Sequence, residues 1–158
     1  MIAPEIKIWT LRESGHGHEH TMINDPAKLY GFWMDQVTQA SWYDPMKEAS
    51  VVFLVDTQRK LIAYHLVSLG TLDSTLTHPR EVFRPAVIHA ASAILFAHNH
   101  PSGNPSPSEA DIKVTRDLIR AGQLLRIDLL DSLIIGAPGQ GRNEQGYTSL
   151  RELGYFYK

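Results

Sequence analysis

Two histidines one residue apart, His98 and His100, begin the proline-rich stretch HNHPSGNPSPSEAD, residues 98–111. The segment before them, ASAILFA, is apolar enough to form a buried strand. Because side chains of a strand alternate between its two faces, both imidazoles can point the same way, as two ligands of one ion must. Asp111 follows in the first turn of a predicted helix. Two imidazoles and one carboxylate leave the fourth tetrahedral position to water, which is typical of catalytic zinc sites.

A helix start that needs no metal explains part of the same pattern. Ser108 followed by Asp111 is an N-cap serine with an acid at the third helical position. The acid also suits the positive end of the helix dipole. Capping and metal binding are compatible in one loop, and four matched positions arise by chance on the order of once in a thousand chains of this length. The combined pattern favours a metal site.

The rest of the sequence predicts the elements that would position these side chains. Two apolar, β-branched runs around a polar turn, 50–55 and 61–69, indicate a hairpin. The run before His98 is typical of a central strand, and 108–125 has the pattern of an amphipathic helix. We also expect a helix over 25–42, a helix over 78–92, a strand over 127–136, and a tail packed through Tyr147, Leu150 and Leu153. This order indicates an α/β fold, with a mixed sheet between helices.

Composition limits the classes of function. The 158 residues are enough for one globular domain, and there is no cysteine, so histidine, acidic residues and water must hold any metal. A net charge of −2 disfavours a nucleic-acid partner. The modest basic cluster of Lys113, Arg116 and Arg120 is expected to be an exposed helix face. The sequence contains no secretory leader and no bilayer-spanning apolar run, which predicts a cytoplasmic protein without a membrane partner.

The spacing of His98, His100, Ser108 and Asp111 resembles the signature of the JAMM (MPN+) zinc metalloproteases. The segments PREVFRPAV, AHNHPSGNPSPSEAD, LIIG and YTSLRELG are similar to the RadC-like JAB branch of that superfamily. The resemblance covers the chain from about residue 45 to the C-terminus. It implies a three-layer α/β/α sandwich around a mixed sheet, as in cytidine deaminases. It also implies Zn²⁺ on His98, His100 and Asp111, and peptide or isopeptide substrates, often at ubiquitin-like proteins.

The family also requires an upstream glutamate as general base. Glu48 directly precedes the first hairpin strand and matches that place, although most glutamates are solvated surface acids. Glu81 is the competitor, but it is expected in the first turn of a helix. We therefore assign the base to Glu48, which must reach the water within hydrogen-bond distance. The resemblance suggests that Ser108 donates a hydrogen bond to the developing oxyanion.

The chain departs from the RadC-like pattern in two places. Relatives usually carry an N-terminal helix-hairpin-helix segment, whereas residues 1–45 lack its glycine-centred pattern. We expect residues 1–45 to form an extension that packs on a JAB/MPN domain of residues 46–158. Many relatives also have a histidine where Ser132 follows Asp131, so a role for that histidine is not carried over.

Two rival functions and four further histidines remain open at this point. A non-catalytic MPN-like scaffold would lose ligands, but this chain retains all of them, and a DNA-repair role would rest on basic patches. The sequence indicates neither the substrate nor the oligomeric state. His65, inside an apolar strand, is expected to be a structural histidine. The alternating histidines of HGHEH are expected to lie in a solvated loop rather than a metal site; they are His16, His18 and His20.

Overall fold

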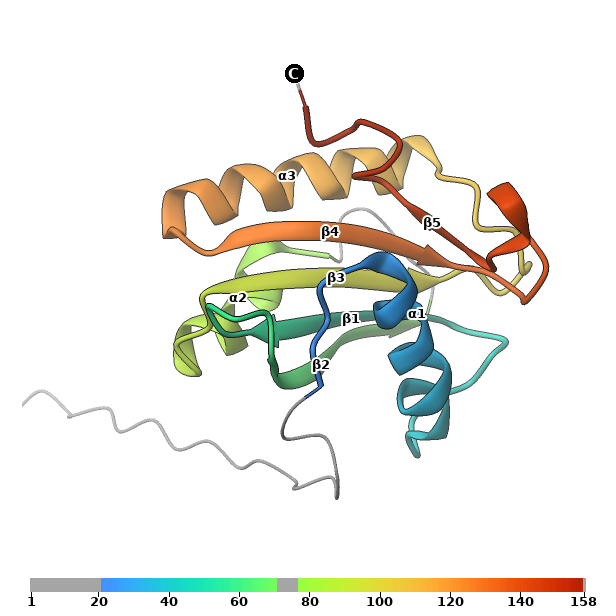
Figure 1. Ribbon diagram of the computed structural model, residues 1–158, viewed down its shortest axis with the longest axis horizontal. Coiled ribbons are helices and arrows are strands. Elements are labelled where there is room, and N and C mark those ends of the chain that lie inside the picture. The colour runs from blue at the N-terminus through green and yellow to red at the C-terminus, as the bar shows by residue number, and fades with distance from the viewer. Residues whose placement is uncertain (1–20, 71–76, 158) are drawn as a thin grey trace, which may run out of the picture.

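A single mixed sheet of five strands forms the centre of the computed structural model, which describes residues 21–70 and 77–157 (Figure 1). The strand order is β2-β1-β3-β4-β5, in which β3 and β4 are parallel and the other neighbours are antiparallel. The strands are β1 (Glu48–Val55), β2 (Leu61–Gly70), β3 (Ala93–Asn99), β4 (Asp128–Ile135) and β5 (Tyr147–Ser149). All of β3 and nearly all of β1 are buried, as expected for central strands.

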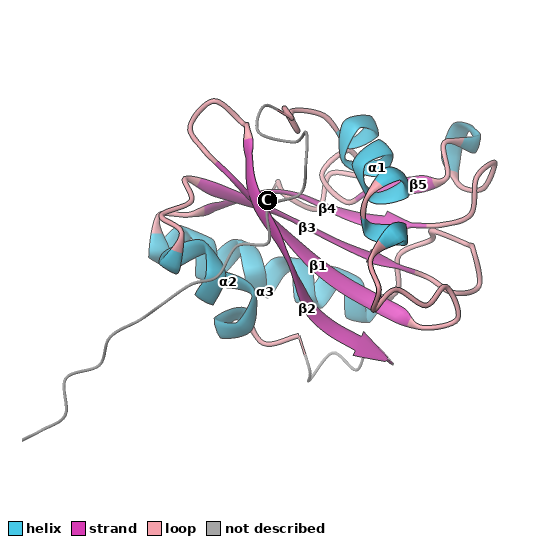
Figure 2. Cartoon of the chain, turned by 90° about the horizontal axis from the view of Figure 1, so that it is seen from below, coloured by secondary structure: helices cyan, strands magenta, loops and turns pink. Residues whose placement is uncertain are grey.

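Helices cover both faces of the sheet (Figure 2). One face packs against α1 (Pro26–Asp35), and the other packs against α2 (Pro79–Ile88) and α3 (Glu109–Leu125). Alternate residues of each central strand therefore enter two separate cores: Val51 and Phe53 face α1, whereas Val52 and Leu54 face the other helices. This arrangement confirms the predicted three-layer α/β/α fold.

The topology brings three distant segments to one edge of the sheet. Because β1 and β3 are antiparallel, the first residues of β1 lie beside the last residues of β3, and Ser50 is the register partner of His98. The chain leaves β3 at this edge and enters α3 after a short loop. The start of β1, the end of β3 and the start of α3 consequently meet there (Figure 1).

Several predicted boundaries and environments differ from the structure. The helix predicted over 25–42 begins as expected, with Asp25 as N-cap and proline first, but it ends at Asp35 and is followed by a short 3₁₀ turn, Val37–Gln39. The Thr38 hydroxyl donates to the Met34 carbonyl at 2.6 Å, in the place of the helical backbone bond. The tail contributes a short strand, β5, that the sequence did not predict.

Two predicted environments are wrong. His65 is exposed on β2, because β2 is the edge strand of the sheet, so it is not a buried structural histidine. Leu153 is 41% exposed, whereas Tyr147 and Leu150 are buried as expected. The strand considered within residues 1–10 and the alternating histidines His16, His18 and His20 lie outside the described residues. Within 21–70 and 77–157, no helix is long and apolar enough to cross a membrane.

Candidate metal centre

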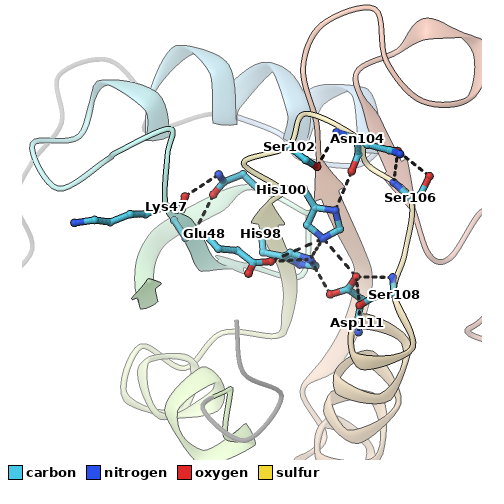
Figure 3. Close-up of polar contacts among 11 residues, drawn as sticks. Lys47, Glu48, His98, His100, Ser102, Asn104, Ser106, Ser108 and Asp111 are labelled. Carbon is cyan, nitrogen blue, oxygen red and sulfur yellow. Dashed lines mark hydrogen bonds and ion pairs between the residues drawn. The ribbon is translucent and has the colours of Figure 1, made fainter. Parts of the chain in front are cut away.

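Four side chains converge at the edge where β1, β3 and α3 meet (Figure 3). They are Glu48 from the start of β1, His98 from β3, His100 just beyond it, and Asp111 in the first turn of α3. One ligand atom from each lies within 4.8 Å of the others. The sequence predicted these four residues, and the structure brings all of them together.

The spacing of two imidazole nitrogens and one carboxylate group suits a tetrahedral zinc ion. The Nε2 atom of His98 lies 3.1 Å from Nε2 of His100 and 3.0 Å from an oxygen of Asp111. The second Asp111 oxygen lies 3.4 Å from Nε2 of His100. Ligands bonded to one tetrahedral zinc at about 2.1 Å are roughly 3.4 Å from one another. The two imidazoles and the carboxylate could therefore hold Zn²⁺ with little movement.

The Glu48 carboxylate lies farther from the two imidazoles than the Asp111 carboxylate does. Its Oε1 atom is 3.9 Å from Nε2 of His98 and 3.8 Å from Nε2 of His100, and its side chain is 18% exposed. This separation suits a carboxylate that reaches the ion through a water molecule rather than by direct ligation. The competitor Glu81 lies half-buried in the first turn of α2 and forms an ion pair with Arg84 at 3.1 Å. It is not part of the cluster.

Ser108 orients the Asp111 carboxylate. Both the backbone N–H and the hydroxyl of Ser108 donate to Oδ2 of Asp111 at 2.7 Å, while Oδ1 faces His98. The Ser108 hydroxyl also accepts from the Asp111 N–H, which completes the predicted capping box. Burial alone would raise the pKa of the Asp111 carboxyl, but hydrogen bonds from His100 and His98 outweigh it and keep this pKa well below its usual range.

The ring orientation of His100 is fixed by the backbone of the loop. Its Nδ1 atom lies 2.9 Å from the carbonyl oxygen of Asn104. Because a carbonyl only accepts, Nδ1 carries a proton, and Nε2 is the ring nitrogen that faces the centre of the cluster and is placed to bind an ion. Burial tends to lower the pKa of His100, but its hydrogen bonds to Asp111 and to the Asn104 carbonyl raise this pKa overall.

The loop between β3 and α3 rests on the segment after β4. The His100 N–H donates to the Ile135 carbonyl at 2.9 Å, and Ala137 N–H donates to the Gly103 carbonyl at 2.8 Å. A Cβ atom at Gly136 would lie 2.5 Å from the Gly103 oxygen, so glycine permits this close approach. The loop is therefore tight, as predicted, and it fixes the distance between the histidines and the helix start.

Asn99 is a positioning residue that the sequence did not reveal. Its side-chain oxygen accepts from the Ala49 N–H at 2.8 Å, and its amide donates to the Lys47 carbonyl at 3.0 Å. These two bonds hold the backbone on both sides of Glu48 in place. The only sequence signal was a buried-strand asparagine between two histidines, and its partners are about fifty residues away.

Ser132 occupies the place where relatives often have a histidine. It is buried on β4, and its hydroxyl accepts from the Thr115 hydroxyl of α3 at 3.0 Å. This bond joins β4 to α3. None of the hydrogen bonds described for Ser132 reaches the four converging residues.

The comparisons with known proteins agree with this geometry. The model of the family described as "RadC-like JAB domain" matches residues 23–155. The chain is 42% identical over 136 residues to UPF0758 protein tlr1707 of Thermosynechococcus vestitus, which covers 85% of this chain and 49% of that protein. It is 38% identical over 138 residues to UPF0758 protein TTE0897 of Caldanaerobacter subterraneus, covering 87% of this chain and 54% of the relative.

A UPF0758 protein of Methanosarcina mazei is also similar, at 42% identity over 133 residues, covering 84% of this chain and 53% of the relative. The chain thus spans about half the length of these curated relatives. The match begins upstream of residue 45, where the sequence resemblance was first visible, and it includes α1. A family model that covers most of the chain confirms the resemblance, and the protein belongs to the RadC-like JAB domain family.

Proposed function

We propose that the protein is a zinc-dependent hydrolase of amide bonds, with a peptide or isopeptide as substrate. The observation that carries this proposal is the convergence of two imidazole nitrogens and one carboxylate at 3.0–3.4 Å, with Glu48 just outside them. Nitrogen and carboxylate ligands of this kind suit Zn²⁺. When bound, the ion would supply Lewis acidity toward water and the scissile carbonyl.

The protein's own residues would then move the protons. Glu48 would accept a proton from the attacking water at its carboxylate and pass it to the nitrogen of the leaving amine. The Ser108 hydroxyl, which is at the exposed start of α3, would release its bond to Asp111 and donate its hydrogen to the developing oxyanion, while the Ser108 N–H keeps its bond to Asp111. Such a donor is worth about 3 kcal/mol of transition-state stabilisation. Asn99 would hold the backbone of Glu48 in place throughout.

The two rival functions have less support. A scaffold has no need for four metal-binding side chains whose ligand atoms lie within 4.8 Å of one another. A DNA-binding role would need free basic side chains, but Lys113 and Arg120 both pair with Asp117. The chain spans about half of its relatives' length. The class of substrate, including a ubiquitin-like protein, is therefore a proposal.

Metal analysis and a glutamate variant test the proposal. We expect one zinc per chain, and Glu48→Gln should keep that zinc but lose hydrolysis of a peptide and isopeptide library read by mass spectrometry. The matched control is Glu81→Gln, which alters a half-buried glutamate outside the cluster that pairs with Arg84, and it should behave as wild type. Full turnover by Glu48→Gln would refute the assignment of the base. Failure of the wild type to bind stoichiometric zinc would refute the hydrolase and favour the scaffold.

A further inference from the structure

A buried serine is the neighbour of His98 on the adjacent strand. Ser50 of β1 is the register partner of His98 in β3. Both side chains point toward the face covered by α2 and α3, since they share the parity of Val52 and Phe96 in that core. Ser50 is 0% exposed and His98 is 2% exposed. A cross-strand pair on one face places the two Cβ atoms about 5 Å apart.

Both of these buried residues have an unused polar atom. Nδ1 of His98 and Oγ of Ser50 make no hydrogen bond within the described part of the chain. Buried polar groups are nearly always hydrogen-bonded, because an unsatisfied one has lost its bonds to water without replacing them. At this separation, a rotation of the serine about χ1, or one bridging water, would join the two atoms.

His98 differs from His100 in this respect. The Nδ1 atom of His100 is held by the Asn104 carbonyl, whereas Nε2 of each ring points to the centre of the cluster. Histidine ligands of metals almost always donate their other ring N–H to an acceptor. On the opposite flank of β3, the register partner of His98 is Ile134, which offers only an apolar side chain. Ser50 is therefore the polar one of the two register partners.

We propose that Ser50 is a positioning residue for the metal centre. Its hydroxyl accepts a hydrogen bond from Nδ1–H of His98, directly or through one water, and so keeps Nε2 unprotonated and aimed at the ion. Ser68, the register partner of Ser50 on β2, would offer an acceptor for the Ser50 hydroxyl hydrogen once the serine side chain has rotated. This inference rests on the proposed zinc site and adds a residue that the metal-ligand motif does not contain.

The test compares Ser50→Ala with Ser132→Ala. Both variants remove a buried serine hydroxyl from the same face of the sheet, but the Ser132 hydroxyl bonds to Thr115 and not to a ligand. We expect the zinc dissociation constant, measured by competition with a chelating dye, to rise about tenfold or more in Ser50→Ala and to stay within twofold of wild type in Ser132→Ala. Far-ultraviolet circular dichroism checks that both variants fold.

A second readout follows the Nδ1 proton of His98 in the zinc-loaded protein. Long-range ¹H–¹⁵N correlation spectra should show this proton in the wild type and in Ser132→Ala, and its signal should be broadened by exchange with water in Ser50→Ala. Unchanged zinc affinity in Ser50→Ala, or an equal loss in both variants, would overturn the inference while leaving the hydrolase proposal intact. A wild-type chain that binds no zinc would overturn both.

Discussion

Ser108 combines two roles at one residue. Its hydroxyl caps α3 and bonds to Asp111, and its exposed position lets it meet a substrate carbonyl. Replacing Ser108 with alanine should lower the free energy of unfolding by about 1 kcal/mol through the lost cap. The Asp111 carboxylate keeps its bond from the backbone N–H of residue 108, so zinc should remain. Hydrolysis should fall about 100-fold through the lost oxyanion donor.

Kinetics and metal content measured on the same preparation separate these two roles. The matched control is Ser106→Ala, since the Ser106 hydroxyl is exposed on the same loop and donates to Asn104 at 2.8 Å, away from Asp111. Ser106→Ala should retain both zinc and turnover. If Ser108→Ala loses stability but hydrolyses at the wild-type rate, the residue is only a helix cap.

At the scale of elements, a buried carboxylate joins β4 to β5 and the tail. Asp131 accepts from the Ser149 hydroxyl at 2.6 Å, from the Ser132 N–H at 2.7 Å and from the Arg151 N–H at 3.2 Å. Burial raises the pKa of its carboxyl despite these bonds. The folded state therefore holds this proton more tightly than the unfolded state. The contribution of Asp131 to stability falls as pH rises from about 3.9 through the raised pKa.

Asp131→Asn isolates this effect, because asparagine keeps the shape and can still accept the backbone bonds. We expect the free energy of unfolding of Asp131→Asn, minus that of wild type, to be larger at pH 7 than at pH 4, so that the variant gains relative stability as pH rises. The reason is that only the wild-type residue ionises and incurs the burial penalty at neutral pH. Urea unfolding at the two pH values measures the difference. A difference that is constant, or that grows toward pH 4, would contradict the assignment.

At the scale of the whole molecule, the proposed ion would join three segments that are distant in the sequence: the start of β1, the end of β3 and the start of α3. Ligands bound only by the folded state stabilise it, by about 2.7 kcal/mol at a hundredfold excess over Kd. For a chain of 158 residues this should raise the melting temperature by roughly 5–10 °C. Addition of a chelator should reverse the shift in differential scanning fluorimetry.

Asp111→Asn and magnesium provide the controls for this measurement. The variant lacks the charged oxygen that faces His98, so zinc should shift its melting temperature little. Magnesium should have no effect on the wild type, because it prefers oxygen ligands over imidazole. A zinc-dependent shift that is equally large in Asp111→Asn would show that zinc binds elsewhere on the chain.

The sequence by itself determined the local parts of the site. A buried strand that ends at Asn99, a helix capped by Ser108 and a tight loop between them are all encoded within residues 93–111, where hydrogen-bond capping and side-chain periodicity act over short distances. The α/β class followed from the order of such segments. Glu48 could be nominated only by its place before a strand and by family resemblance.

The sequence predicted the β1–β2 hairpin, but the tertiary structure alone decided the other strand neighbours. Glu48 approaches the histidines, and Ser50 faces His98, because β1 pairs antiparallel with β3 in one register, and pairing between distant segments is a property of the whole fold. The bonds from Asn99 to residues 47 and 49 have the same origin. The strand β5 escaped prediction because three residues are too few to show a period, and its pairing with β4 is what makes it a strand.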